Sequence, residues 1–285
     1  MSPTRFESML HEARLRGRAV GAFTCYDLWG AEAVLRAAED RGAPAIMLVS
    51  PGSFAAPGGP RLLRALRAMA RESSADVLVQ LDHATDPDLI ARAADLGADA
   101  VMADGSKRPY ADNLAFSATI VERLALVGVG VEAELGRVEG HEDRTGEAVL
   151  AGELTAPEEA RAFREESDVA CLAVAVGNVH GHYTGTPALD WERLGLIASA
   201  DDRPLSLHGA SGLPEADLRR AVGHGVAKVN VNTELRGAYF RALGTELAGR
   251  AGSLDLAGLG ERVTEAVRDV VDEKLEAFGW GEGAQ

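Results

Sequence analysis

Short runs of hydrophobic residues recur along the chain, and longer segments of mixed character separate them. Each run is too short for a buried helix and is rich in the aliphatic residues that favour buried strands. We therefore expect eight buried strands. The runs lie at Ala19–Phe23, Ala43–Val49, Asp76–Leu81, Ala98–Met102, Gly128–Val131, Val169–Val176, Pro204–Leu207 and Val226–Val231.

The segments between the runs have the spacing of amphipathic helices, together with residues that begin and end helices. Pro87 and Pro214 stand at expected helix starts, and Gly97 and Gly225 stand at expected helix ends. A last helix is expected over Leu259–Phe278, before a polar tail.

Eight alternations of strand and helix in 285 residues favour a (β/α)8 barrel, the TIM-barrel class of α/β fold. We expect one domain over residues 1–285, with the last helix added to the barrel. The alternative is a doubly wound sheet in two halves. The connection between the fifth and sixth runs is long and polar, which is typical of a lid over an active site.

The composition argues against some classes of binding partner. The formal net charge of −15 argues against nucleic acid and against an anionic membrane surface. No stretch reaches the roughly 18 apolar residues that span a bilayer, and the N-terminus carries no apolar signal core. Two cysteines exclude a disulfide framework, and Cys171 lies within a hydrophobic run. We expect a soluble, cytoplasmic protein.

Polar residues that directly follow the runs are the candidates for chemistry, because barrel enzymes carry their active sites at the carboxyl ends of the strands. His83, His180 and His208 each lie at the end of a run. Three imidazoles with an open fourth position are a catalytic zinc arrangement. His182 is an alternative partner of His180, because residues two apart on a strand share a face. Each histidine alone is more simply a hydrogen-bonded residue of the barrel rim.

A second group of small and polar residues follows the seventh and eighth runs. The segments His208–Gly212 and Asn230–Glu234 both lead into helices, and helix N-termini favour anions. Loops after these two strands are the usual phosphate site of a barrel. Lys228 shares a strand face with Asn230, and we interpret it as a structural lysine paired with a carboxylate rather than as a Schiff-base nucleophile.

These residues lie in motifs that resemble the class II, zinc-dependent ketose-bisphosphate aldolases, which include fructose-1,6-bisphosphate and tagatose-1,6-bisphosphate aldolases. The similarity runs in order from about Gly21 to Phe278, and three motifs together make it specific. They are LDHA (Leu81–Ala84), GNVHG (Gly177–Gly181) and HGASG (His208–Gly212). The resemblance implies a TIM-barrel lyase that cleaves a ketose phosphate reversibly to dihydroxyacetone phosphate and an aldehyde.

The resemblance also implies an ion and its ligands. His83, His180 and His208 match the ligands of the catalytic Zn²⁺. Asp104 and Glu134 match carboxylates that hold a second or displaced metal. A monovalent cation is left open as a further ion.

Roles in proton transfer and substrate binding follow from the same resemblance. Asp82 matches the acid/base at the C4 hydroxyl, and Glu142, in the long loop, matches the lid residue that moves the proton at C1. The remaining matches are expected to bind substrate: Gly181, Gly209, Ala210, Ser211, Asn230, Val231, Asn232, Thr233 and Ser50.

Three positions near the expected pocket depart from the family pattern. Thr24 stands where many members have Asn, and Asn232 where fructose-type members have Asp and tagatose-type members Ala. Lys107-Arg108 replaces a more common His-Leu. These differences leave the aldehyde partner open, although chain length favours the tagatose-type and short bacterial branches.

Two other functions are alternatives to the lyase: a phosphosugar-binding barrel without lyase activity, and a metal-free isomerase on the same fold. The departures at Thr24 and Asn232 favour the first of these, and three histidines at strand ends argue against the second. Because members of the resembling family are usually dimers or tetramers, we expect a homodimer or homotetramer.

Overall fold

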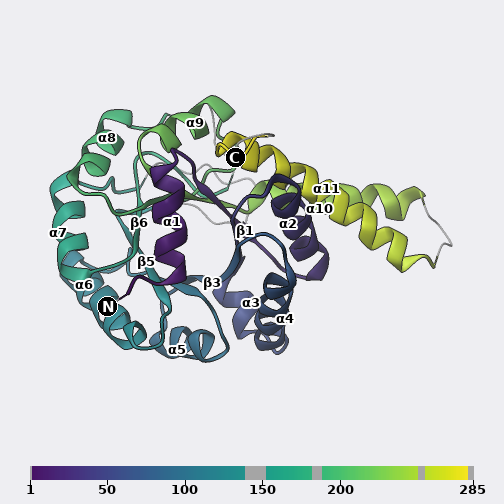
Figure 1. Cartoon of the computed structure of the whole chain (residues 1–285), viewed down its shortest axis with the longest axis horizontal. Helices are drawn as coiled ribbons and strands as arrows, with labels where there is room; N and C mark the ends of the chain where they lie inside the picture. Colours follow the sequence, from purple (N-terminus) through teal and green to yellow (C-terminus); the bar gives the residue numbers. More distant parts are fainter. Residues whose placement is uncertain (1, 139–151, 182–187, 250–253, 282–285) are drawn as a thin grey trace.

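The computed structural model describes residues 2–138, 152–181, 188–249 and 254–281. Within these residues, eight strands form a closed barrel in chain order, and all neighbouring strands are parallel, β8 with β1 included. Helices surround the barrel on its outside (Figure 1). The expected (β/α)8 TIM barrel is therefore confirmed, and the alternative of a doubly wound sheet is wrong.

Each of the eight hydrophobic runs coincides with one strand, and the third and fifth strands continue furthest beyond their runs. The third continues through Asp82 and His83, and the fifth through Glu132 and Glu134. The barrel encloses most of these polar side chains, so the hydrophobic pattern underestimates both strands. The strands are β1 (Val20–Thr24), β2 (Ala45–Val49), β3 (Val77–Ala84), β4 (Ala100–Ala103), β5 (Gly130–Leu135), β6 (Cys171–Val174), β7 (Leu205–Leu207) and β8 (Val226–Val231).

The predicted helix boundaries lie within three residues of the observed ones: Pro87 begins its helix, the helix expected at Pro214 begins at Glu215, and the last helix spans Leu256–Ala277 instead of Leu259–Phe278. Asp86 caps the helix that starts at Pro87 by accepting a hydrogen bond from the backbone N–H of Asp88, and Gly97 follows that helix with a positive φ of 96°. The helices are α1 (Arg5–Leu15), α2 (Leu28–Arg41), α3 (Pro51–Ala55), α4 (Gly59–Glu72), α5 (Pro87–Asp95), α6 (Tyr110–Ala125), α7 (Pro157–Ser167), α8 (Trp191–Ala200), α9 (Glu215–Gly223), α10 (Thr233–Gly249) and α11 (Leu256–Ala277).

Helix α1 closes the amino end of the barrel. It packs against β1, β5 and β8, which lie around the barrel, and it crosses the barrel in Figure 1. Its Phe6 is fully buried, and a Cβ on Gly130 at the start of β5 would lie 2.7 Å from the Phe6 side chain. With this end closed, the carboxyl end is left for ligands.

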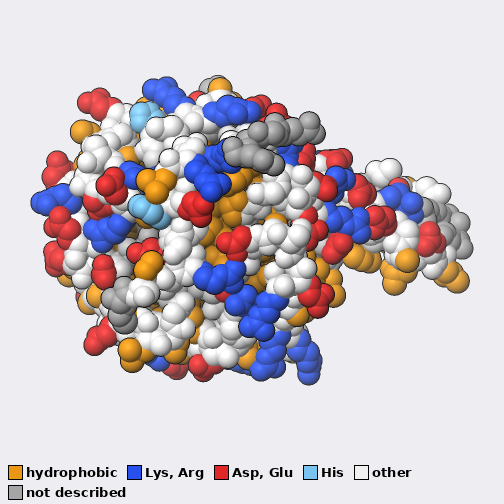
Figure 2. All heavy atoms as spheres, viewed as in Figure 1, with side chains coloured by type: hydrophobic (Ala, Val, Ile, Leu, Met, Phe, Trp, Pro, Cys, Tyr) orange, Lys and Arg blue, Asp and Glu red, His pale blue; other side chains and the backbone are white. Residues whose placement is uncertain are grey.

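Helices α10 and α11 form an arm that extends beyond the barrel (Figure 1). The predicted C-terminal helix is confirmed as α11, which packs along α2, where the Trp29 indole fills the space beside Gly260. The outer arm exposes large hydrophobic side chains, and orange atoms gather along its lower edge in Figure 2. The exposed residues include Phe240, Leu247 and Leu256.

The visible surface carries acidic and basic side chains in close alternation (Figure 2). Many of them pair across helices, as Arg36 of α2 does with Glu261 and Glu265 of α11. No helix in the described ranges is long and apolar enough to cross a membrane. Cys25 and Cys171 are buried free thiols, as expected for Cys171.

Truncating Phe6 of α1 tests how much the closure of the amino end of the barrel contributes to stability. Phe6→Ala should lower the free energy of unfolding by about 3–5 kcal/mol, because it leaves a cavity under the strands. Leu15→Ala, on the same helix, is the control; Leu15 is 71% exposed, and its truncation should change stability by about 0.5 kcal/mol or less. Thermal and urea unfolding followed by circular dichroism measure both. Equal midpoints for the two variants would contradict a closing role for Phe6.

Candidate functional site

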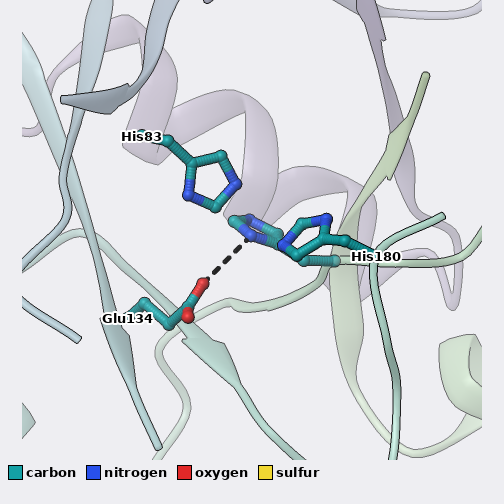
Figure 3. A group of neighbouring side chains, drawn as sticks. His83, Glu134 and His180 are labelled. Carbon is teal, nitrogen blue, oxygen red and sulfur yellow. Dashed lines mark ion pairs between the residues drawn. The ribbon is translucent and has the colours of Figure 1, made fainter. Parts of the chain in front are cut away.

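Four side chains from different strands meet at the carboxyl end of the barrel. His83 comes from β3, Glu134 from β5, His180 from the segment after β6 and His208 from the residue after β7. One potential ligand atom from each lies within 4.8 Å of the other three, and Figure 3 shows the side chains of His83, Glu134 and His180 directed toward the same region. The structure thus brings together the three histidines that strand-end position singled out.

The backbone of β3 is distorted where it presents its two functional residues. The pairing of β3 with β4 shifts register between Leu81 and Ala84, which marks a bulge, and His83 has a positive φ of 46°. A non-glycine residue in this region is strained. The bulge lets the consecutive residues Asp82 and His83 both approach the centre of the site, whereas a regular strand would direct them to opposite faces.

Two of the imidazoles are oriented by carboxylates. Asp104 Oδ2 lies 3.0 Å from Nδ1 of His83, and Glu132 Oε1 lies 2.9 Å from Nε2 of His208. A carboxylate accepts a hydrogen bond, so each of these nitrogens carries a proton and the other ring nitrogen is left as a ligand. The ring atoms available as metal ligands are therefore Nε2 of His83 and Nδ1 of His208.

The atoms left over fit a metal. Nε2 of His83, Nδ1 of His208 and Oε2 of Glu134 are buried, and none has a hydrogen-bond partner within the described residues. Such orphaned polar atoms are costly unless something binds them. Nitrogen ligands from histidine and one carboxylate oxygen are the donors that suit Zn²⁺. The donor set thus fits a zinc ion.

The charges around these side chains also favour binding of a cation. Burial disfavours protonated His83, but the charge of Asp82 and the hydrogen bond to Asp104 outweigh burial and hold the pKa of His83 well above its ordinary value. Burial likewise lowers the pKa of His208, yet its contacts with Glu132 and Glu134 raise it overall. The imidazoles sit in an excess of negative charge, which a divalent cation would neutralise.

The carboxylates of the site have different partners. Glu134 Oε2 is 3.3 Å from Nδ1 of His208 and belongs to the four-residue group. Asp104 lies outside that group and holds the far side of His83; its other oxygen accepts hydrogen bonds from the N–H and Oγ of Ser106. Burial opposes ionisation of Asp104, but its bond to His83 keeps its pKa below the ordinary value. A metal-binding role for Asp104 stays a prediction.

Asp82 lies next to the four-residue group without belonging to it. Its Oδ2 accepts a hydrogen bond of 3.1 Å from Nδ2 of Asn230 in β8 and lies 3.9 Å from Nε2 of His83. Its Oδ1 is buried and has no hydrogen-bond partner among the described atoms. One oxygen is therefore fixed by the barrel, and the other is left to exchange a proton with a ligand.

The turns after β6 and β7 contact each other backbone to backbone. Gly209 has a φ of 62°, and a Cβ there would clash with the carbonyl oxygen of Val179. Asn178 fastens the same two turns, because its Nδ2 donates to the carbonyl oxygen of His208 at 3.0 Å while its Oδ1 accepts from Val176 N–H. These contacts fix the positions of His180 and His208 relative to each other.

The other predicted substrate-binding residues lie at the same end of the barrel. Ser50 caps α3 directly after β2, and Gly181 follows His180 with a φ of 91°. Thr233 begins α10, so the N-terminus of this helix opens at the end of β8, whereas α9 begins only at Glu215. The rest of the group is buried in or beside the ends of β7 and β8: Ala210, Ser211, Asn230, Val231 and Asn232.

Two predicted residues lie outside the described residues. Glu142, expected in the lid, falls in 139–151, and His182, the alternative metal ligand, falls in 182–187. Sequence reasoning gave no role to Glu132 or Asn178, although both follow hydrophobic runs. Glu132 could have been found from its spacing to Glu134. Residues two apart on a strand share a face, so both carboxylates lie inside the barrel if one does.

Comparisons with known proteins agree with this site. The family model described as Fructose-bisphosphate aldolase class-II matches residues 4–282. A curated relative from Bacillus subtilis strain 168, named a probable fructose-bisphosphate aldolase, is 36% identical over 275 residues, which cover 95% of each chain.

Solved structures of aldolases share the whole fold. A crystal structure from Coccidioides immitis, named as a fructose-1,6-bisphosphate aldolase, has a TM-score of 0.90 at 35% identity and covers 99% of this chain and 98% of its own. The YdjI aldolase from Escherichia coli K12 has a TM-score of 0.87 at 27% identity and covers both chains completely.

Removing one imidazole tests the metal group. His83→Ala should lower zinc affinity by about 100-fold or more, since one of the ligands is lost. His224→Ala is the matched control, because its ring stacks on Trp191 at 6.0 Å between centroids, away from the group. Zinc content after dialysis, measured by mass spectrometry, should stay near about one ion per chain in the control. Equal zinc content in both variants would place the metal elsewhere.

Proposed function

Because the chain belongs to the class II fructose-bisphosphate aldolase family, we propose that it reversibly cleaves a ketose phosphate or bisphosphate to dihydroxyacetone phosphate and an aldehyde with the help of Zn²⁺. The observation that carries the proposal is the convergence of His83, His180, His208 and Glu134 beside the free Oδ1 of Asp82. Breaking a carbon–carbon bond beside a carbonyl requires both stabilisation of negative charge and a base for the hydroxyl proton.

The three histidines would hold the metal, with Glu134 as an oxygen ligand. When bound, Zn²⁺ acts as a Lewis acid that polarises the substrate carbonyl and stabilises the negative charge left by bond cleavage. Asp104 orients His83, and Glu132 orients His208. Each carboxylate holds its histidine in the tautomer whose other ring nitrogen is available to the metal. A second metal and a monovalent cation stay open.

Asp82 is the proposed acid/base at the C4 hydroxyl. In cleavage its Oδ1 takes the hydroxyl proton, and in condensation it returns that proton to the new hydroxyl. The bond from Asn230 to Oδ2 supports this role, because it holds the carboxylate in one orientation. Glu142 is proposed to move the proton at C1 from the loop before α7, in keeping with the family resemblance.

Dihydroxyacetone phosphate is proposed to bind through backbone amides rather than through basic side chains. Glycines at 181 and 209 allow the turns after β6 and β7 to approach a ligand closely. Thr233 opens α10, whose N-terminal N–H groups favour a phosphate. The further residues proposed to line this half of the site are Ala210, Ser211, Asn230, Val231, Asn232 and Ser50.

The aldehyde half of the site is proposed to lie near the end of β1, with Asn232 at the border between the two halves. Thr24 and Asn232 depart from the family pattern, and the Tyr26 hydroxyl lies 3.2 Å from Oδ1 of Asn232. Tyr26 and Asn232 are therefore neighbours at this point, and Asn232 is one of the two departures. The aldehyde partner is therefore proposed as the feature in which this chain could differ from the fructose-type members.

A homodimer or homotetramer in the cytoplasm is proposed as the working form. The exposed hydrophobic residues of the arm, such as Phe240 and Leu247, support contact between subunits, because patches of this kind mark interaction surfaces. Analytical ultracentrifugation measures the state directly.

Replacing the proposed acid/base tests the reaction. Asp82→Asn should lower kcat by about 10²–10⁴-fold, because the amide cannot accept the proton, while zinc stays bound. Asp88→Asn, an exposed carboxylate of α5, should leave kcat unchanged. A coupled assay over a panel of ketose mono- and bisphosphates, with zinc measured on the same samples, gives both values. Binding without cleavage of any substrate would favour the phosphosugar-binding barrel instead.

Filling the close contact between the two turns tests the phosphate half. Gly209→Ala should raise KM for dihydroxyacetone phosphate by about 10-fold or more, because the added Cβ must displace the Val179 carbonyl and its turn. Gly223→Ala, in α9, is the matched control, since its Cβ would enter open space. Condensation kinetics at saturating aldehyde measure the difference. An unchanged KM in the Gly209 variant would remove this turn from the site.

A further inference from the structure

A buried lysine lies beneath the metal group. Lys228 of β8 is fully buried, and its ammonium contacts Glu132 Oε2 at 2.9 Å and Asn230 Oδ1 at 2.5 Å. Burying a charge is costly, so such a group persists where its contacts are needed. Neither of its two partners binds the metal, but each contacts a residue that the proposed reaction uses.

The first partner leads to a metal ligand. Glu132 is fully buried, and its two oxygens face different donors: Oε2 accepts from Lys228 and from Gln80 Nε2 at 2.6 Å, while Oε1 faces Nε2 of His208 at 2.9 Å. The lysine therefore holds Oε2, so that the carboxylate presents Oε1 to His208.

The second partner leads to the acid/base. An ammonium donates hydrogen bonds and accepts none, so the Asn230 atom that faces Lys228 must be the amide oxygen. The amide nitrogen then points the other way, to Asp82 Oδ2 at 3.1 Å. Without the cation, nothing in this pair of contacts would prevent the amide from rotating and presenting its oxygen to the Asp82 carboxylate.

We propose that Lys228 is a positioning residue that holds both halves of the reaction centre, the His208 ligand through Glu132 and the Asp82 carboxylate through Asn230. The inference rests on the proposed aldolase function. The lysine acts from below the site as an ion-paired cation, and it exchanges no proton and forms no bond with substrate. One side chain thus couples metal binding to the orientation of the acid/base.

The first test compares two buried changes in the barrel interior. Lys228→Met keeps the length of the side chain and removes its donors; it should lower kcat by about 100-fold with KM within about threefold, and lower zinc affinity by about 10–100-fold. Ser206→Ala is the control, since Ser206 of β7 is equally buried and its Oγ has no partner among the described residues. It should change each value by less than about threefold.

A double-mutant cycle separates positioning from a general structural effect. If Lys228 acts through Asp82, Lys228→Met should lower kcat far less in the Asp82→Asn background than in the wild type, because the group that it orients is already disabled. Fully additive losses would overturn the Asp82 branch. An unchanged zinc affinity, measured by competition with a chromophoric chelator, would overturn the His208 branch.

A second variant covers the case in which Lys228→Met does not fold. Lys228→Gln keeps an amide donor toward Asn230 and loses the charge toward Glu132, so it should retain more kcat than the Met variant while showing the same loss of zinc affinity. Failure of both variants to fold would show a purely structural lysine and overturn the proposal. If the wild type cleaves no ketose phosphate, the proposed function fails, and the zinc affinities still decide the His208 branch.

Discussion

The carboxylate of Glu132 is buried in the barrel, where an unpaired charge would cost several kcal/mol. It is satisfied by donors from three directions, Gln80 of β3, Lys228 of β8 and His208 after β7. Because a buried carboxylate must keep these partners, it fixes the relative positions of four strands at the depth where the site begins. The barrel is therefore not a neutral support for the metal group. Its own internal charge balance determines which nitrogen of His208 is held by Glu132 and which faces Glu134.

The hydrophobic pattern predicted the barrel well because strands enclosed by helices on one side and by the core on the other are nearly continuous in apolar residues. It failed where the interior is polar: β3 and β5 were expected to end before Asp82 and Glu132, and both continue through them. The pattern also gave no warning of α1, whose Phe6 covers the amino end of the barrel. Such closing elements depend on contacts distant in sequence.

The histidines of the site could be predicted from their positions at strand ends, since a closed parallel barrel brings all those ends together. Their tautomers and partners could not. Asp104 orients His83 because its Oδ2 lies 3.0 Å from His83 Nδ1, a distance that depends on how β3 and the end of β4 are placed in the barrel. The positive φ of His83 accompanies a local register shift that the amino-acid composition does not indicate. The motif resemblance supplied roles that geometry alone does not assign, such as that of Glu142.

The contact between Gly209 and Val179 has a consequence for altering the enzyme by design. The backbones of the turns after β6 and β7 are in direct contact. A larger residue in one turn therefore displaces the main chain of the other and, with it, His180 or His208. The end of β1 and the start of α10 meet through the side chains of Tyr26 and Asn232. A combinatorial library aimed at the proposed aldehyde half is best restricted to this second region, where one side chain can be exchanged for another while the peptide framework around His180 and His208 stays in place.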